Sequence, residues 1–423
     1  MANRHGSPRR SSRWLALAAA LALLAAVGPA RAAEPIRIGI SISLTGSLAA
    51  NAKAGLMAMQ MCVDDINAKG GLLGRPVELI HYDDQSSAAN VPAIYTKLLD
   101  VDKVDLLISP YGTNLSAPAM PVAIASGRVI MGFVALAISG QFKYDRYFQI
   151  GPFGPDSQSA WSKGFFDLAM AMEPKPQTIA IVAADAEYPK FASDGAREHA
   201  KRLGLKIVYD RSYPPTTTDF TPVVRSIQAA NPEIVYVASY PADSTGLLRS
   251  VNELGLKTRL FGGGLAGPQY ASIKQQIGQG LNGMVDYDFY VPETTMNFPG
   301  IHDFLLRYQA RAAQEGVDPL GFYLPPLGYA LVQVLGEAVA RAETIESKPL
   351  AEYLHKATFH TVVGDIRFGP LGERDKAAIL TVQYQGIKGN DIAQFKEPGH
   401  QVILDPPELK SGEFRYPYSD IQR

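Results

Sequence analysis

Cysteine is almost absent from this chain. The 423 residues include only Cys62, so the protein can form no internal disulfide. Small exported domains often depend on several disulfides because their apolar cores are small. A chain of this length can instead bury enough apolar surface for two domains, each with its own core.

Motifs for catalysis and metal binding are also scarce. The seven histidines form no H-E-x-x-H pair, no G-x-S-x-G turn occurs, and Cys62 falls on the apolar face of an expected helix. The stretch Gly262-x-Gly264-x-x-Gly267 has the form of a dinucleotide fingerprint, but one short match in a glycine-rich chain has a high false-positive rate. We therefore predict a protein that is not an enzyme and that uses no cofactor and no metal.

A long apolar run occurs only at the start of the chain. Four arginines precede Trp14 to Val27, a run of 14 residues, and Ala30-Arg31-Ala32 follows it. This layout predicts a signal peptide over residues 1–32 that is cleaved near Ala32, and hence a periplasmic protein. A retained membrane anchor is the alternative, but the run is shorter than the roughly 20 residues that cross a bilayer. Arg9-Arg10 suggests twin-arginine export, although no apolar pair follows it.

The charges are nearly balanced, with 40 basic and 41 acidic residues. Loss of the leader removes five arginines and no acid, which takes the formal net charge from −1 to −6. A mildly acidic exported protein has no electrostatic reason to bind nucleic acid or an anionic membrane.

Strand and helix patterns alternate after the leader. In the first part, strands are expected at 36–40, 77–80, 104–109 and 129–134, with helices at 51–69, 92–99 and 117–125. The pattern restarts after Gly151-Pro152, with strands at 178–183, 206–209, 233–238, 259–261 and 283–286, and helices at 191–203, 221–230, 244–254, 301–314 and 327–342. Residues 365–368 and 378–384 are expected to form a hairpin. Repeated β-α units predict an α/β fold with two lobes, each a parallel sheet flanked by helices, and a ligand cleft beyond the carboxyl ends of the strands.

Several segments together resemble a known family. They are Ile38-Gly-Ile with Leu44-Thr-Gly46, Asp65-Ile-Asn-Ala-Lys-Gly-Gly71, Leu73-Gly-Arg-Pro-Val-Glu-Leu79, Asp83-Asp84, Asp185 with Tyr188, Asp219-Phe-Thr-Pro222, and Gly364, Phe368 and Gly372. Their order and spacing are similar to those of type I periplasmic substrate-binding proteins of the branched-chain amino acid (Leu/Ile/Val-binding) ABC transporter family.

The resemblance implies a clamp whose lobes are joined by three crossovers, near Gly151, Asp286–Asp288 and Thr361–Gly364. Lobe one would hold residues 34–151 and 287–362, and lobe two residues 152–286 and 363–423. It also implies that the lobes close over a small ligand by a hinge motion and that a membrane permease recognises the closed monomer.

The first expected ligand contacts follow the strand at 104–109. The loop there runs through Gly112 into a helix, whose free N–H groups and dipole suit a carboxylate, and Thr113 and Asn114 add polar side chains. Ordinary helix capping would explain the same residues without a ligand. In the family, this loop holds a ligand carboxylate.

The resemblance also places four other residues at the ligand. Ala135 lies in the apolar loop 133–138, which is either core packing or a wall for a bulky apolar ligand. Tyr188 and Tyr240 align with tyrosines that cover the ligand, and Asn51 with an aromatic that lines the pocket. Without the resemblance, Tyr240 reads as rim packing and Asn51 as a helix N-cap.

One position departs from the family. Amino-acid binders have an acid at the position of Gly264, where it pairs with the ligand ammonium. Either Asp185, Asp243 or Asp288 supplies that charge here, or the ligand has no ammonium, because an unpaired buried ammonium costs several kcal/mol. An aromatic or aliphatic carboxylate then competes with an amino acid as the ligand.

The sequence leaves three functional classes in order of preference. The first is the solute-binding component of an ABC importer, and the second is a ligand-binding sensor or regulator of the same fold. The third is an exported enzyme on a similar scaffold, for which no acid–base pair is visible.

Overall fold

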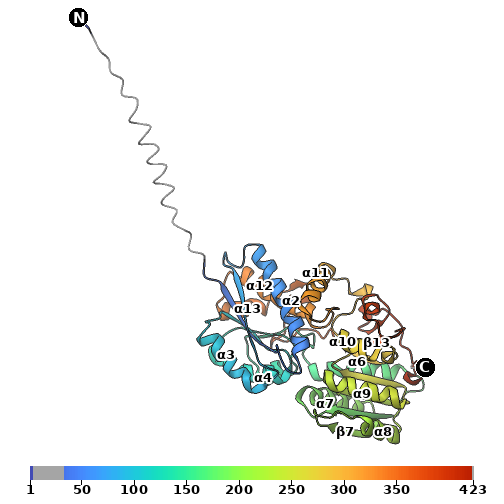
Figure 1. The fold of residues 1–423 in the computed structure, drawn as a ribbon. Helices are drawn as coiled ribbons and strands as arrows, with labels where there is room; N and C mark the ends of the chain where they lie inside the picture. The colour runs from blue at the N-terminus through green and yellow to red at the C-terminus, as the bar shows by residue number, and fades with distance from the viewer. Residues whose placement is uncertain (3–32, 422–423) are drawn as a thin grey trace.

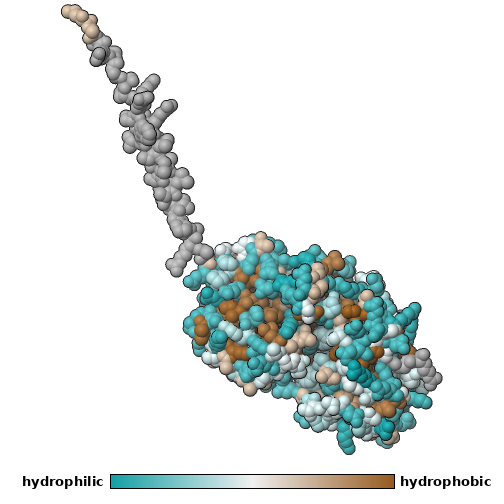
Figure 2. All heavy atoms as spheres, viewed as in Figure 1, coloured by the Kyte–Doolittle hydropathy of each residue, from teal (hydrophilic) through white to brown (hydrophobic). Residues whose placement is uncertain are grey.

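The computed structural model describes residues 1–2 and 33–421. The predicted signal peptide and its cleavage site fall almost entirely outside these residues. Figure 1 shows two lobes, one with the blue, cyan and orange segments and one with the green, yellow and red segments. Over most of the face drawn in Figure 2 the residues are polar, and apolar residues gather mainly on the first lobe.

A five-stranded parallel sheet forms the core of the first lobe. Its order is β2-β1-β3-β4-β5. Six of the seven residues of β1, from Ile36 to Ile42, are buried, as expected for a strand that helices cover on both faces. The strands are β1 (Ile36–Ile42), β2 (Val77–Asp83), β3 (Leu106–Ile108), β4 (Ile130–Gly132) and β5 (Tyr147–Gln149).

Helices from two parts of the sequence surround this sheet (Figure 1). The early ones are α2 (Ala49–Ala68), α3 (Val91–Asp100), α4 (Thr113–Ser126) and α5 (Ile138–Phe142); the late ones are α11 (Ile301–Glu315), α12 (Leu324–Ala342) and α13 (Ser347–Leu354). Helices α2 and α12 approach closely at Gly55 and Gly328. A Cβ at position 328 would lie 2.8 Å from the Gly55 carbonyl oxygen, so the packing requires a glycine there.

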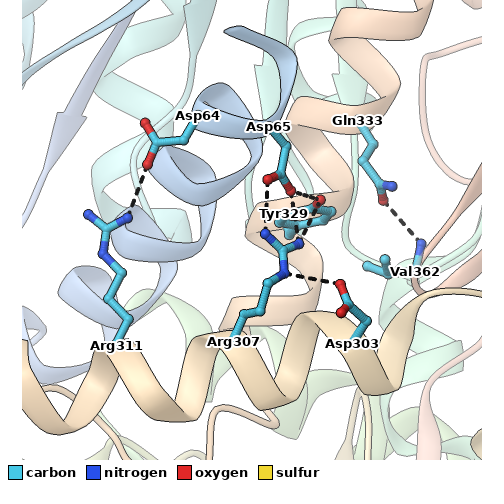
Figure 3. A network of polar contacts seen from close by, with 8 residues as sticks. All are labelled: Asp64, Asp65, Asp303, Arg307, Arg311, Tyr329, Gln333 and Val362. Atoms are coloured by element: carbon cyan, nitrogen blue, oxygen red, sulfur yellow. Dashed lines mark hydrogen bonds and ion pairs between the residues drawn. The ribbon is translucent and has the colours of Figure 1, made fainter. Parts of the chain in front are cut away.

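A polar network fastens α11 to α2 and α12 (Figure 3). The Arg307 guanidinium donates to both carboxylate oxygens of Asp65, at 2.9 and 2.8 Å, and the Tyr329 hydroxyl donates to Asp65 at 2.5 Å. Arg311 pairs with Asp64 at 3.1 Å. Burial alone would raise the pKa of Asp65, but the hydrogen bonds from Arg307 and Tyr329 outweigh it and hold that pKa below its usual value.

The second lobe contains a seven-stranded sheet in the order β14-β13-β10-β9-β8-β6-β7. Strands β10 to β7 are parallel, and β13 and β14 add an antiparallel pair at one edge. The strands are β6 (Thr178–Ala184), β7 (Lys206–Tyr213), β8 (Ile234–Ser239), β9 (Leu260–Leu265), β10 (Val285–Asp288), β13 (Leu380–Tyr384) and β14 (Gln401–Asp405). The helices are α6 (Ser157–Ala171), α7 (Glu187–Arg202), α8 (Thr221–Ala230), α9 (Pro241–Leu254), α10 (Ala271–Ile277) and α14 (Tyr418–Ile421).

The expected hairpin near the C-terminus is wrong. Residues 364–366 form β12, which pairs with β11 (Phe359–Thr361), whereas β13 joins the large sheet beside β10. The exact lobe boundaries remain a prediction, although β10 continues in the second sheet to Asp288, past the predicted boundary at 286.

The segments after β5 and after β12 run side by side. Phe153 and Ala377 form an antiparallel bridge, and the Gln149 N–H donates to the Gly372 carbonyl at 2.7 Å. Two of the segments that cross between the lobes, the paired passages, are therefore hydrogen-bonded to each other.

Candidate ligand-binding site

Strands of both sheets end around one cavity between the lobes. Tyr111 follows β3, Val134 follows β4, Tyr188 and Tyr240 follow β6 and β8, and Ala266 follows β9. The cavity has an empty volume of about 410 Å³. It occupies the place where open α/β sheets bind ligands.

Aromatic residues make up half of the residues that line the cavity. The indole of Trp161 packs 4.3 Å from the Tyr287 ring and 5.4 Å from the Tyr188 ring, measured between centroids. Tyr188 in turn lies 5.6 Å from Tyr240. The aromatic lining consists of Tyr111, Phe153, Trp161, Tyr188, Tyr240, Tyr287 and Tyr323. No side chain among the described residues that line the cavity is charged, so its wall suits an apolar ring or chain.

A few polar atoms of the wall have no partner among the described residues. The Tyr240 hydroxyl and the Trp161 indole nitrogen are buried without a hydrogen bond. By contrast, the Tyr188 hydroxyl donates to the Gly264 carbonyl at 2.8 Å, and the Tyr287 and Tyr323 hydroxyls lie 3.0 Å apart. Burial raises the pKa of Tyr188, Tyr287 and Tyr323, so these hydroxyls stay neutral and can donate. Tyr240 and Trp161 thus each carry a buried donor in the cavity wall that has no partner among the described residues.

The start of α4 borders the same cavity. Gly112 has a φ of 96°, a conformation that favours glycine, and it turns the chain from β3 into the helix. Gly112 and Thr113 line the cavity, and the Thr113 hydroxyl oxygen accepts a bond from the Leu136 N–H at 3.0 Å. Its own O–H remains available as a donor. Asn114 is not part of the lining, and its side-chain oxygen is buried without a partner.

The other expected residues fall in two places. Ala135, Tyr188 and Tyr240 line the cavity together with Thr113. Asn51 does not line it, and its amide donates to the Tyr111 hydroxyl at 3.5 Å, behind the wall. The reading of Asn51 as an N-cap is wrong, because α2 begins at Ala49 after Leu48.

Residues 35–388 match the model of the periplasmic binding protein family. The chain belongs to this family. It is 24% identical over 400 residues to the Leu/Ile/Val-binding protein homolog 8 of Brucella suis, which covers 90% of this chain and 95% of that protein. The resemblance drawn from the sequence is confirmed.

Two solved structures share the fold. One is the branched-chain amino acid transporter substrate-binding protein LivJ of Streptococcus pneumoniae in complex with isoleucine, with a TM-score of 0.71 and 20% identity, covering 84% of this chain and 98% of that one. The other is a solute-binding protein of an ABC transporter from Rhodopseudomonas palustris in complex with 3,4-dihydroxybenzoic acid, with a TM-score of 0.70 and 18% identity, covering 84% and 94%.

Family membership shows which class of protein this is. Periplasmic binding proteins bind small ligands outside the cytoplasm and do not transform them, so this protein is a binding protein and not an enzyme. In the described part of the chain, no helix is long and apolar enough to cross a membrane.

The three acids that could replace an acid at position 264 do not line the cavity. Asp185 pairs with Lys190 at 3.0 Å, and Asp243 accepts a bond from the Tyr213 hydroxyl at 2.6 Å. Asp288 accepts from the Gln401 amide at 3.1 Å. Their carboxylates therefore have partners elsewhere in the second lobe.

Gly264 itself lies inside β9 and does not line the cavity; the residue of this segment that does is Ala266. A Cβ at 264 would lie 2.9 Å from the Tyr236 hydroxyl, so no acidic side chain fits there without rearrangement. The dinucleotide-type motif is also explained: Gly262 and Gly264 pair with β8 within the sheet and form no strand-to-helix turn.

Five of the seven aromatic residues of the wall, all except Tyr188 and Tyr240, could not be assigned to it from the sequence. Trp161 lies on α6, a helix that was not expected, while Tyr287 lies in β10 of the second sheet and Tyr323 precedes α12. One usable signal was that Trp161 is one of only two tryptophans in the chain. The two tyrosines carried no local signal.

Proposed function

We propose that this protein is the extracytoplasmic solute-binding component of an ABC importer and that its ligand is a small aromatic carboxylate without an ammonium group. The observation that carries the proposal is the interlobe cavity, which seven aromatic side chains line and no charged side chain of the described residues enters. An amino acid would bury its ammonium there without a counter-charge, at a cost of several kcal/mol.

The comparisons allow both ligand classes. A neighbour of the same fold holds isoleucine and another holds 3,4-dihydroxybenzoic acid. The wall of this cavity favours the second class, because flat rings pack well against tyrosine and tryptophan faces.

The start of α4 is the proposed carboxylate site. The N–H groups of the first turn and the O–H of Thr113 would donate to the carboxylate, and the helix dipole favours a negative charge there. The ring would then lie between Ala135 and the rings of Tyr188 and Tyr240, with the Tyr240 hydroxyl bonding a ring substituent. Asn51 would act indirectly by holding Tyr111, and Asn114 through its position in the same helical turn.

Closure of the lobes is part of the proposal. Contacts that join the two lobes support it: the Ala271 N–H at the start of α10 donates to Asp318 at 2.8 Å, and the Tyr111 and Tyr270 hydroxyls lie 3.5 Å apart. A monomer with its leader removed near Ala32 would present the closed lobes to a membrane permease.

The test is a binding panel on the purified mature protein. Calorimetry and thermal shift would compare benzoate, 4-hydroxybenzoate and 3,4-dihydroxybenzoate with leucine, isoleucine and phenylalanine, and 4-hydroxybenzamide serves as the matched neutral control. A ligand that binds the folded state raises the melting temperature. We expect shifts with the aromatic acids and weaker ones with the amide; binding of the amino acids alone would refute the proposal. The mass of the exported protein checks the cleavage site.

A further inference from the structure

A larger cavity adjoins the aromatic one. It has an empty volume of about 860 Å³, and it shares Ala135 and Phe153 with the aromatic cavity. Its other walls come from α5, the start of α6 and the segments 149–156 and 371–374. We call it the outer chamber. It lies where the two paired passages between the lobes run side by side.

The outer chamber contains a buried guanidinium without a carboxylate partner. Arg374 is 6% exposed, and no ion pair of the described residues includes it. One terminal nitrogen donates to the Asp365 carbonyl at 3.1 Å and the other to the Ile150 carbonyl at 3.5 Å, while Nε has no acceptor in the part of the chain that the structure describes. Arginine carries five N–H donors, so several remain unused. Burial lowers the pKa of Arg374 to about 10, which leaves it charged at neutral pH.

Both acids of the outer chamber and the Gln149 amide have partners within the protein. The Glu373 carboxylate accepts from the Leu371 N–H at 2.8 Å, and Asp156 caps α6 by accepting from the Ser159 N–H at 3.1 Å. The Gln149 amide donates to the Ala135 carbonyl at 2.6 Å and accepts from the Gly151 N–H at 2.9 Å. Arg374 is therefore the side chain of this chamber with charge and donors left for a ligand.

We propose that the outer chamber is a second subsite of the ligand site, in which Arg374 binds a second carboxylate carried by the ligand. The ligand is then an aromatic dicarboxylate: its ring and first carboxylate occupy the aromatic cavity, and its second carboxylate passes Ala135 and Phe153 to reach the guanidinium. A planar guanidinium binds a carboxylate through paired hydrogen bonds. This inference rests on the proposed function, because it needs the ring and first carboxylate to bind as described there.

The first test changes the ligand and leaves the protein intact. Calorimetry would compare 4-(carboxyalkyl)benzoates of increasing chain length with the matching compounds whose side-chain carboxylate is a carboxamide. We expect at least one diacid to bind about 10-fold more tightly than its amide, the size of one charge-assisted contact. Equal affinity for acid and amide across the series would overturn the subsite. Because benzoate alone reports on the aromatic cavity, benzoate binding with no preference for diacids refutes only the subsite, and no binding of any aromatic acid refutes the proposed function.

The second test changes the protein. Arg374→Gln should reduce the preference for the diacid over its amide to about 2-fold or less, and Arg374→Lys should restore part of it. Arg367→Gln is the matched control, because Arg367 is an exposed arginine whose closest acid is Asp375 at 3.9 Å, and it is not part of the lining. An unchanged preference in Arg374→Gln would contradict the proposal. A second result would also contradict it: added acetate raises the affinity for benzoate in the wild type but not in Arg374→Gln. The chamber would then bind a free anion, separate from the ligand.

Discussion

The Tyr188 hydroxyl donates a 2.8 Å hydrogen bond to the carbonyl oxygen of Gly264. Tyr188 lies in the first turn of α7 and Gly264 inside β9, so the bond joins two elements that are distant in sequence. It holds the ring at the edge of the aromatic cavity, against Trp161 and Tyr240. The position at which related proteins were expected to carry an acid thus supports a tyrosine of the wall through its backbone.

Substitutions of Tyr188 should separate its ring from its hydroxyl. Tyr188→Phe loses the bond to Gly264 and should lower the free energy of unfolding by about 1 kcal/mol, with little change in ligand affinity. Tyr188→Ala also removes the ring and should weaken binding of an aromatic acid by about 10-fold or more. Urea unfolding and calorimetry measure the two effects; equal affinity in Tyr188→Ala and the wild type would exclude the ring from the site.

Removal of the Tyr240 hydroxyl should lower ligand affinity and not stability, the opposite of what we expect for Tyr188. The Tyr240 hydroxyl is buried without a partner among the described residues, so Tyr240→Phe should leave stability unchanged or raise it by about 1 kcal/mol. Binding of 4-hydroxybenzoate should nevertheless fall by about 10-fold, because the ligand loses its partner. Benzoate, which lacks the ring hydroxyl, is the control ligand, and its affinity should stay within about 2-fold of the wild-type value. A clear loss of stability would mean that the hydroxyl has a partner in the free protein.

Ala266 offers a direct test of the uncharged wall. Ala266→Asp places a carboxylate in the wall of the cavity that would hold the ligand carboxylate, and Ala266→Asn adds a side chain of nearly the same shape without charge. Repulsion between like charges should make the loss of affinity for 4-hydroxybenzoate at pH 8 at least about 10-fold greater in the Asp variant. Similar losses in the two variants would indicate that steric fit alone governs this position.

The close approach of α2 and α12 predicts a cost for a single methyl group. Gly328→Ala brings a Cβ to 2.8 Å from the Gly55 carbonyl oxygen, so the helices must separate, and we expect a loss of about 1–3 kcal/mol in the free energy of unfolding. Gly140→Ala in α5 is the control, because nothing lies within 4 Å of the place that its Cβ would occupy and its φ is not positive. Chemical denaturation measures the free energy of unfolding of both variants. An unchanged value in Gly328→Ala would show that α2 and α12 can separate at no cost in stability.

Asp243 should make stability depend on pH. Burial raises its pKa from 3.8 to about 6, so the folded protein holds this proton more tightly than the unfolded chain does. The stabilisation from proton binding is therefore complete below about pH 4 and is lost as the pH rises through about 6. Asp243→Asn keeps an acceptor for the Tyr213 hydroxyl and should exceed the wild type in stability by up to about 3 kcal/mol at pH 8.

The pH series provides the internal control for Asp243. The advantage of Asp243→Asn should fall to a small fraction of its pH 8 value near pH 4 and vanish at still lower pH, where the wild-type carboxyl is protonated in both states. Urea unfolding at several pH values measures it, and a difference that stays constant from pH 4 to pH 8 would show that the carboxyl does not titrate in this range.

Local patterns of the sequence predicted the elements whose signal is contained within one segment. The alternating strands and the amphipathic helices follow from periodicity, and the position of Thr113 follows from a glycine loop between a strand and a helix. Longer-range pairings could not be found in this way. Residues 380–384 have the alternation of a hairpin strand, but they pair with β14 on one side and, on the other, with β10, which lies far earlier in the chain. Asp64 and Asp65 lie within α2 and bind Arg311 and Arg307, which are more than 240 residues away in the sequence and could not be identified as partners from a local pattern.

The sequence by itself determined the α/β architecture, the family and the absence of an acid at position 264, because each of these is written in residue types and spacings along one stretch of chain. Only the tertiary structure decided what surrounds the ligand. Trp161, Tyr287 and Tyr323 belong to three separate segments and meet because the chain passes between two sheets. The proposed role of Arg374 likewise depends on its burial beside a cavity. The sequence shows only that an arginine is present, and not whether its charge is solvated or buried without an acidic partner.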